Sequence, residues 1–414
     1  MRYRIINKKK LLWISPYVPY DQVRHAGGKT HNYDIKYFQK SGLFDIHLLT
    51  LAQCSDKDFI DLDQYGISYR AAIVDGKVLK NFLRILMNAN SVFNSRHRLC
   101  QTILSYQYYC LKKMIRQYSL GNVPDIVIMQ WTGAGFLLPY IRKLFPNAYT
   151  VIIEEDVTFL GYQRRYQQER NFIKKQQYKT RYDQLKRREL ELLEHCSLVV
   201  VNNDKDRRLI VKSGIKDGKI YTVAPYYKDY SHVCRNDNLS NVIYYGAMDR
   251  KENHEAAMWL IHHVMPQIGD INVELYIIGV NPKEELKRME TDRIHIIGFV
   301  DDVSPYFSHA MCMAVPLHLG AGIKVKILEG MSAGLPVLTN AVGIEGIPAK
   351  KGYEYYRCNT AEEYAATIRQ LYNNSTEMER TSQNAKRFMQ NNFNIDNKLN
   401  GLIKLLLKES QRKL

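Results

Sequence analysis

The stretch that decides the fold is HLGAGIKVKILEGMSAGLPVLTN, residues 318–340. The apolar run MCMAVP (311–316) precedes it and predicts a buried strand, and a helix is predicted to begin near Ile323. The order is therefore strand, glycine-rich loop, helix N-terminus, and the stretch closes on a second strand-like run, PVLT (336–339). A strand–helix–strand unit of this kind is typical of a parallel α/β sheet.

The loop and the helix that follows carry groups suited to a diphosphate. Gly320 and Gly322 let an anion approach the backbone closely, and the amides and dipole of a helix N-terminus attract it. Lys324 and Lys326 add positive charge, so we expect the diphosphate to be held without a metal ion. Glu329 falls about two turns into the helix, where a carboxylate can accept hydrogen bonds from ribose hydroxyls. The alternative is a tight glycine turn followed by a solvated helix face.

The same alternation of strand-like runs and helical patterns extends along the chain. Strands are predicted at 11–15, 45–51, 125–130, 149–154, 197–202, 242–246, 273–279, 293–298, 311–316 and 336–339. Helices are predicted at 29–41, about 77–118, 135–144, 162–194, 252–264, 283–290, 324–333, 361–373, 377–391 and 395–410. The fold class is therefore α/β, with two Rossmann-like domains, 1–225 and 226–394, and a final helix, 395–414, that we expect to cross back to the first domain.

Composition narrows the class of protein. The chain has 414 residues, 45% hydrophobic and 24% charged, which is ordinary for a globular protein of two or three domains. No run of 18 apolar residues occurs, and the apolar run near the N-terminus is too short for a signal peptide. The seven cysteines are scattered without zinc-type spacing. We expect a cytoplasmic protein with reduced thiols.

The excess of positive charge lies in the first half of the chain. Residues 1–225 hold 37 Lys and Arg against 20 Asp and Glu, whereas residues 226–414 hold 22 of each class. Two basic, tyrosine-rich helical stretches, 76–120 and 161–196, carry much of this excess. Such stretches suit an anionic membrane surface, at which the protein would be peripheral, or a phosphate-bearing acceptor. A solvated helix face is the alternative, and nucleic acid is a weaker one.

The segment GAGIKVKILEGMSAGLPVLTNAVGIEGI (320–347) resembles the donor-binding signature of retaining glycosyltransferases of family four. The segments 242–268, with Gly246 and Asn253, and 294–317, with Phe299 and Val300, resemble the family's donor domain. In the first half, residues 16–42 resemble the first strand and its glycine loop, with Gly27 and Gly28, and residues 124–165 resemble acceptor-domain strands.

The resemblance implies the GT-B fold, in which two Rossmann-like domains face each other across a cleft, with the donor on the second domain. It implies a retaining mechanism without a metal or other cofactor. The cations that stabilise charge on the departing β-phosphate would be Lys326 and Arg250. The full set of expected donor-binding residues is Gly27, Gly28, Gly246, Arg250, Lys251, Phe299, Val300, Gly320, Ala321, Gly322, Ile323, Lys324, Lys326 and Glu329. For Arg250 and Lys251 an ordinary solvated loop charge is the alternative.

Two positions depart from the family pattern. Ala321 stands where many members have a glutamate that binds the donor sugar. Glu155 stands where many have a histidine in the loop after the strand TVIIE. Glu155 is preferred to Asp156 as the group that orients or deprotonates an acceptor hydroxyl, and a helix cap or a solvent-facing pair is the alternative.

The sequence thus predicts a glycosyltransferase that moves a sugar from a nucleotide-diphosphate donor, UDP-linked by preference, to a hydroxyl of a surface-polysaccharide or lipid-linked glycan acceptor. The sugar, the base, the acceptor and the oligomeric state stay open. Two other hypotheses compete with it. One is a non-catalytic, glycosyltransferase-like subunit that binds a partner enzyme or glycan, and the other is a glycosyltransferase that acts on DNA.

Overall fold

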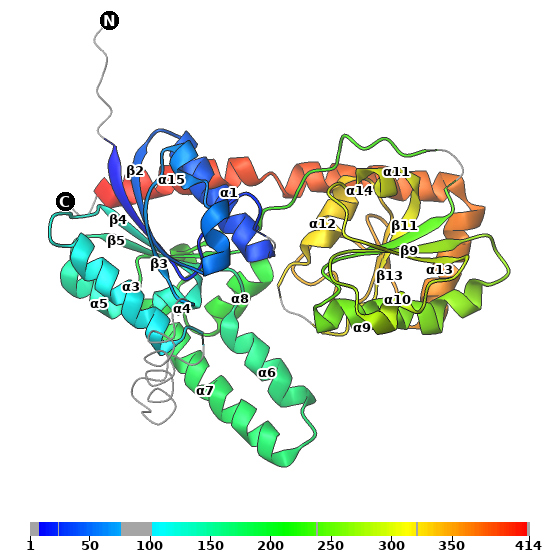
Figure 1. Ribbon diagram of the computed structural model, residues 1–414, viewed down its shortest axis with the longest axis horizontal. Helices are drawn as coiled ribbons and strands as arrows, with labels where there is room; N and C mark the ends of the chain where they lie inside the picture. The colour runs from blue at the N-terminus through cyan, green and yellow to red at the C-terminus, as the bar shows by residue number, and fades with distance from the viewer. Residues whose placement is uncertain (1–7, 24, 76–101, 237–238, 320–321, 412–414) are drawn as a thin grey trace, which may run out of the picture. The chain divides into compact units, whose positions relative to one another are not determined.

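The computed structural model describes residues 8–23, 25–75, 102–236, 239–319 and 322–411, and the chain divides into two compact units (Figure 1). Unit 1 comprises residues 1–226 together with 395–414, and unit 2 comprises residues 227–394. Both are α/β units built on a parallel sheet, so the predicted fold class of two Rossmann-like domains is confirmed.

Unit 1 is built on a seven-stranded parallel sheet with the order β3-β2-β1-β4-β5-β6-β7. Its strands are β1 (Lys9–Ser15), β2 (Phe44–Ala52), β3 (Ser68–Ile73), β4 (Ile126–Gln130), β5 (Tyr149–Glu154), β6 (Leu198–Val201) and β7 (Ile220–Thr222). The central strands are buried on both faces, which is why they appear in the sequence as continuous apolar runs. The strand order reverses between β1 and β4, which is where ligands bind in such sheets.

The helices of unit 1 are α1 (Ala26–Lys40), α3 (Ser105–Tyr118), α4 (Trp131–Gly135), α5 (Leu138–Leu144), α6 (Thr158–Gln168), α7 (Phe172–His195), α8 (Asp204–Lys212) and α15 (Ile395–Gln411). Short 3-10 turns lie at Cys54–Phe59, Leu62–Tyr65 and Asp217–Lys219. Helix α15 packs on α1 and β5, and the hydroxyl of Tyr33 donates a hydrogen bond to the carboxylate of Asp396. The predicted helix over 77–118 falls partly on residues 76–101, which lie outside the described ranges.

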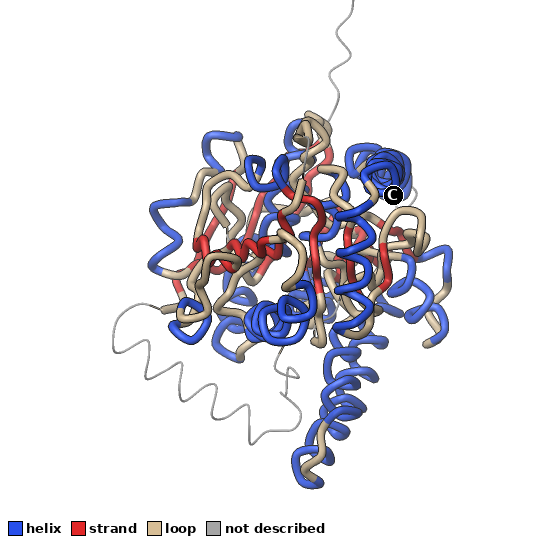
Figure 2. The backbone as a smooth tube through the Cα atoms, turned by 90° about the vertical axis from the view of Figure 1, so that its right-hand side faces the viewer, coloured by secondary structure: helices blue, strands red, loops and turns tan. Residues whose placement is uncertain are grey.

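One prediction in unit 1 is wrong. The sequence predicts a single helix over 162–194, whereas the structure contains two antiparallel helices, α6 and α7, that form a hairpin. The side chain of Asn171 caps α7 by accepting a 3.1 Å hydrogen bond from the amide of Lys174. The carboxylate of Glu169 accepts a 2.9 Å hydrogen bond from the amide of Asn171 and closes the turn. In both views the hairpin projects away from the sheet of unit 1 (Figures 1 and 2).

Unit 2 is built on a six-stranded parallel sheet with the order β10-β9-β8-β11-β12-β13. Its strands are β8 (Asn241–Tyr245), β9 (Glu274–Ile278), β10 (Ile294–Gly298), β11 (Ala310–Val315), β12 (Val337–Thr339) and β13 (Tyr356–Arg357). Its helices are α9 (Lys251–Trp259), α10 (Glu284–Lys287), α11 (Ser304–His309), α12 (Val325–Ser332), α13 (Ala361–Asn373) and α14 (Ser375–Asn392), and α9 runs on into a π-helical turn (Leu260–Val264) and a 3-10 turn (Met265–Ile268). The order reverses between β8 and β11.

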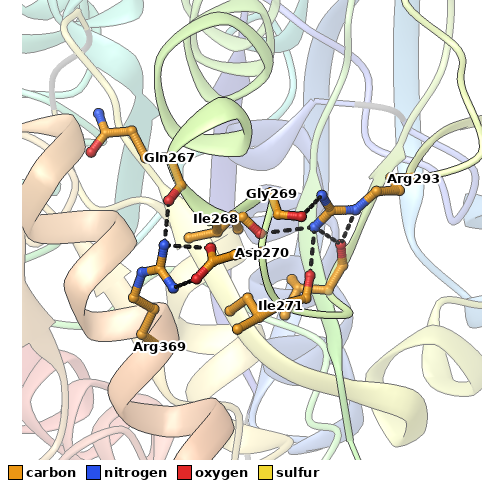
Figure 3. Close-up of polar contacts among 8 residues, drawn as sticks. Gln267, Ile268, Gly269, Asp270, Ile271, Arg293 and Arg369 are labelled. Atoms are coloured by element: carbon orange, nitrogen blue, oxygen red, sulfur yellow. Dashed lines mark hydrogen bonds and ion pairs between the residues drawn. The ribbon is translucent and has the colours of Figure 1, made fainter.

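Two arginines fix the connection that leads into β9 (Figure 3). The guanidinium of Arg293 donates hydrogen bonds to the carbonyls of Ile268, Gly269, Ile271 and Val273, at 2.8 to 3.2 Å. Arg369, on α13, forms a two-pronged ion pair with Asp270 and donates to the carbonyl of Gln267. These contacts fix the backbone of residues 267–273 to Arg293, directly before β10, and to Arg369 on α13.

Candidate functional site

One candidate site lies at the carboxyl ends of the strands of unit 2, where Gly246 follows β8 and Gly279 follows β9. A Cβ atom on Gly279 would lie 1.7 Å from the carbonyl oxygen of Gly246, so the two backbones touch. A Cβ atom on Gly246 would lie 2.5 Å from Nζ of Lys326 and 2.9 Å from Nδ2 of Asn253. Glycine at 246 is therefore what allows a lysine and an asparagine to approach the end of β8.

Lys326, in the first turn of α12, is held at this point by a network of polar side chains. Its Nζ donates hydrogen bonds to Oδ1 of Asn253, at 2.7 Å, and to the hydroxyl of Tyr244, at 3.3 Å. The same Nζ lies 4.6 Å from the centre of the Tyr244 ring. Asn253 is fixed in turn, because its Nδ2 donates to the carbonyl of Ala247 at 2.8 Å. The network aligns one ammonium group with the end of β8, beside the strand-order reversal.

Burial lowers the pKa of Lys326 to about 7, and the positive charge of Arg250 lowers it further. An amine with this pKa gains a proton when an anion binds beside it, because the anion favours the charged form. Lys326 is therefore suited to a phosphate group, which would supply the negative charge that the surroundings lack.

The other cations of the motif are placed differently. Arg250 precedes α9 and pairs with Glu252 at 2.6 Å, and its side chain is 63% exposed. Lys251 is 73% exposed and lies 3.5 Å from Glu255, as expected of a solvated helix face. Lys324 directs its Nζ to the carbonyl oxygen of Gly322, at 2.6 Å, where it closes the glycine loop. Of these cations, Lys326 is the one that Tyr244 and Asn253 hold at the end of β8. Arg250 is near enough for its charge to lower the pKa of Lys326.

Glu329 lies on α12 and is 8% exposed. Its Oε1 accepts a 3.3 Å hydrogen bond from the amide of Lys228, in the segment that enters unit 2. One turn away, Oγ of Ser332 accepts from the amide of Tyr230 at 3.0 Å. Glu329 therefore has a structural contact in addition to the ribose contact that the sequence predicts.

The remaining donor-side residues follow two strand ends. Gly298 ends β10 with a φ of +76°, and the side chain of Phe299 beside it is 66% exposed, with Val300 next in the chain. An exposed aromatic ring at the carboxyl end of a strand suits a flat nucleobase. Gly322 has a φ of +67° and leads through Ile323 into α12. Gly320 and Ala321 lie outside the described residues.

A second candidate site lies at the carboxyl ends of the strands of unit 1. Gly27 and Gly28 fall in the first turn of α1, which His25 caps by accepting a 2.9 Å hydrogen bond from the amide of Gly28. A Cβ atom on Gly27 would lie 3.4 Å from the ring of Trp131, directly after β4. Trp131 has a φ of +64°, which is rare and costly for a residue with a side chain. The edge of the sheet thus presents a tryptophan ring against the start of α1.

Glu155 follows β5 and lies between two amide side chains from the neighbouring strands. Nε2 of Gln130, at the end of β4, donates to Oε1 of Glu155 at 2.8 Å. Nδ2 of Asn202, after β6, donates to Oε2 at 2.8 Å. Burial raises the pKa of Glu155 to about 7, and the nearby charge of Asp156 adds to the rise while the amide bonds oppose it. A carboxyl group with this pKa is half ionised at neutral pH, which suits a general base.

A second carboxyl cluster lies behind Glu155. Burial raises the pKa of Glu154 to about 8, although Thr132 donates a short hydrogen bond to it. Burial also raises the pKa of Glu189, on α7, well above its ordinary range. The carboxylate of Glu189 accepts hydrogen bonds from the amides of Thr158 and Phe159 at 2.8 and 3.1 Å and so caps α6. Glu189 therefore joins the two helices of the hairpin at its base.

The structure adds five residues to the site that the sequence predicts. Tyr244 holds Lys326 together with Asn253, which the sequence matches without a role, Gln130 and Asn202 hold Glu155, and Trp131 is the fifth. No motif in the sequence marks Trp131. The available signal is position: Gln130, Trp131 and Asn202 lie at or directly after the ends of apolar strands, where ligands bind in such sheets. Among the residues that the structure describes, no group of three or more His, Cys, Asp or Glu side chains could hold a metal ion.

Comparison with known proteins identifies the class of the second unit. Residues 240–374 match the model of a family described as "Glycosyl transferases group 1". This segment covers most of unit 2 and includes Gly246, Lys326 and Glu329. The prediction of a glycosyltransferase is confirmed to the extent that residues 240–374 match this family, and the solved structures share the predicted GT-B fold.

Particular relatives are distant. Over 164 residues the chain is 25% identical to an uncharacterized 44.6 kDa protein in the cps region of Klebsiella pneumoniae, and the match covers 37% of this chain and 42% of that relative. Anabaena HepE in complex with UDP aligns over 96% of this chain and 100% of its own, with a TM-score of 0.66 and 12% identity. Sucrose-phosphate synthase from Thermosynechococcus elongatus aligns over 97% and 99%, with a TM-score of 0.69 and 15% identity. At these identities the solved structures establish the fold.

Proposed function

We propose that this protein transfers a sugar from a nucleotide-diphosphate donor, a UDP-sugar by preference, to a hydroxyl of a glycan acceptor. The observation that carries the proposal is the partly buried ammonium group of Lys326, held by Asn253 and Tyr244 at the end of β8 in the segment that matches the glycosyltransferase family. The complex of HepE with UDP supports the choice of base, because that protein shares the fold. A metal-free site and retention of configuration belong to the same proposal.

In this proposal the bond between the sugar's anomeric carbon and the β-phosphate oxygen breaks, and the acceptor oxygen forms the new glycosidic bond. The nucleoside diphosphate leaves with added negative charge, which Lys326, Arg250 and the amides of the glycine loop stabilise. The acceptor hydroxyl gives its proton to Glu155, which Gln130 and Asn202 orient. Lys326 and Glu155 thus supply charge stabilisation and proton acceptance without a protein nucleophile.

The acceptor that we propose is a surface polysaccharide or a lipid-linked glycan. The place of the Klebsiella relative in a cps region supports a polysaccharide acceptor. The ring of Trp131, against Gly27 and 5.3 Å from the ring of Tyr17, offers a face on which a pyranose ring can stack. Tyr17 is 48% exposed and is therefore accessible to a ligand.

A thermal-shift screen of the full chain against nucleotides and nucleotide sugars tests donor binding, and release of the nucleoside diphosphate tests turnover. We expect one nucleotide sugar to raise the unfolding midpoint and to be consumed. Lys326→Met should lose both effects, whereas Lys251→Met, on the solvated face of α9, should behave as the parent does. Binding without release in any acceptor mixture would instead support a non-catalytic subunit, and tight salt-resistant binding of duplex DNA would support a DNA acceptor.

A further inference from the structure

The hairpin of α6 and α7 carries an exposed apolar tip that the proposed site does not use. Phe172 and Ile173, the first two residues of α7, are 81% and 67% exposed. Hydrogen bonds fix the turn at the tip, because Asn171 caps α7 and the carboxylate of Glu169 accepts a hydrogen bond from the amide of Asn171. The hydrogen bonds of the turn hold two large apolar side chains in water, where exposed apolar surface is unfavourable in free energy. We therefore expect a binding partner to cover them.

The hairpin also carries a strong positive charge. From Thr158 to Asp183 it has seven Lys and Arg side chains against two acidic ones, Glu169 and Asp183. Three exposed cations, Arg170, Lys174 and Lys179, lie at or just behind the tip. Aromatic rings accompany the charges, since Lys175 lies 5.8 Å from the ring of Tyr166 and Arg165 lies 5.5 Å from the ring of Tyr162.

The hairpin reaches well beyond the core of unit 1. Leu185 is the first buried residue of α7, and Phe172 precedes it by 13 residues, so the tip stands about 20 Å beyond the core at the ordinary rise of an α-helix. The base is firmly held, with Phe159, Leu185 and Leu193 buried and Glu189 capping α6. In two perpendicular views the hairpin projects as a single arm (Figures 1 and 2).

We propose that this arm docks the protein on an anionic lipid bilayer, with Phe172 and Ile173 inserted among the acyl chains and the lysines and arginines behind them on the lipid phosphates. The charge of the arm is complementary to such a surface, and its apolar tip fits the interfacial layer. Binding to nucleic acid would explain the cations, which contact phosphates, and the tyrosines, which stack on bases. It would not explain the exposed aliphatic side chain of Ile173. Among the described residues, no helix is both long enough and apolar enough to cross a membrane, so the proposed attachment is at the surface.

The test is co-sedimentation of the full chain with vesicles of phosphatidylcholine alone and of phosphatidylcholine mixed with phosphatidylglycerol, whose anionic headgroup supplies the negative surface potential that attracts basic segments. We expect binding to the anionic vesicles and at least a tenfold weaker partition for the double variant Phe172→Ser, Ile173→Ser. The matched control is Leu120→Ser, Val123→Ser, which removes two apolar side chains of similar exposure, 84% and 72%, elsewhere in unit 1. The control should bind as the parent does.

A second readout tests insertion directly. The variant Phe172→Trp should gain, relative to the parent, a blue-shifted emission that brominated lipids quench. Lys174→Glu with Arg170→Glu should lose binding at moderate salt. Equal binding of the tip variant and the control would overturn the proposal, as would binding that ignores lipid charge, or tip-dependent binding to duplex DNA in the absence of vesicle binding. Because vesicle binding needs no turnover, and release of nucleoside diphosphate needs no membrane, failure of one proposal is distinguishable from failure of the other.

Discussion

Nζ of Lys326 donates a 2.7 Å hydrogen bond to Oδ1 of Asn253, 73 residues earlier in the chain. The bond joins the first turn of α12 to the first turn of α9, and these helices follow the two strands, β11 and β8, at which the strand order of unit 2 reverses. One polar contact therefore fixes both sides of the point at which such sheets bind their ligands. The proposed site depends on that contact more than on any other.

Donor binding should take up protons. The free protein holds Lys326 with a pKa of about 7, so above neutral pH the amine is largely neutral, and a bound diphosphate restores its charge. Affinity for a nucleotide sugar should therefore fall as the pH rises above 7. Calorimetry at pH 8 in two buffers with different ionisation enthalpies should give a proton uptake close to one. Lys326→Arg should bind without proton uptake, and an unchanged uptake in that variant would exclude Lys326 as the source.

Glu155→Gln should reduce turnover by on the order of 100-fold or more, the usual size of a general base, while nucleotide affinity stays unchanged. In the parent, turnover should rise with pH through about 7, because a base must be ionised and burial raises the pKa of Glu155 to that value. Initial rates of product release across pH 5.5–9 measure both effects. Glu191→Gln, at an exposed position of α7, is the control, and full turnover in Glu155→Gln would leave Glu155 with a structural role.

Glu329→Ala should weaken nucleotide binding by about 1–3 kcal/mol, the size of a lost hydrogen bond to a charged group. Because Oε1 also accepts from the amide of Lys228, the substitution should lower the unfolding midpoint as well. Comparison of a ribonucleotide with its 2′,3′-dideoxy form separates the two effects. The parent should discriminate strongly between these ligands, and Glu329→Ala should bind them about equally. Retained discrimination in the variant would count against the ribose contact.

Gly279→Ala should destabilise unit 2 by at least about 2 kcal/mol, since the new Cβ atom would meet the carbonyl oxygen of Gly246 at 1.7 Å. Displacement of Gly246 should also disturb Lys326 and reduce nucleotide binding. Urea unfolding and calorimetry measure the two losses. Gly269→Ala is the matched control, because its nearest neighbour would lie 3.6 Å away, and equal stability of the two variants would refute the close approach.

The stability of the protein should fall as the pH rises from about 4.5 to about 8. Over this range the folded protein keeps a proton on Glu154, whose pKa burial raises from 4.5 to about 8, while the unfolded chain loses it. Glu154→Gln removes the share of this dependence that comes from Glu154 and should be more stable than the parent at pH 8, while Glu155 and Glu189, whose pKa values burial also raises, keep their shares. Thermal unfolding at pH 6 and pH 8 measures the difference. Glu191→Gln, on an exposed position of α7, should keep the pH dependence of the parent.

The sequence predicts most of the sheet because its central strands are long apolar runs. Strands β3, β7 and β13 were not predicted, since SYRAAI, the three-residue IYT and the two-residue YR offer little apolar signal and owe their place to the neighbouring strand. The hairpin was predicted as one helix because no Gly or Pro separates α6 from α7. The break there comes from the cap that Asn171 provides, which is visible in the sequence only as one polar residue among many.

The motif residues Lys326 and Gly246 could be predicted because the segments that contain them resemble the family's donor domain. Their partners could not, since the roles of Asn253 and Tyr244 depend on how α9 and β8 lie beside α12. Likewise Glu155 was predicted from its place after β5, whereas its two amide partners come from other strands. The contact of Glu329 with the amide of Lys228 arises from the path of the connecting segment, for which the sequence carries no periodic signal.

Helix α15 completes unit 1 only after the whole of unit 2, and this order has a consequence for biosynthesis. Unit 2 is one continuous segment and can assemble its sheet while it leaves the ribosome. Unit 1 must wait for Leu399, Leu402 and Leu406, which are buried in the finished unit. During that delay the nascent chain exposes the apolar surface that α15 will cover. The need for chaperones during expression should therefore increase with the time needed to translate residues 227–394. Unit 1 begins synthesis first but is completed last.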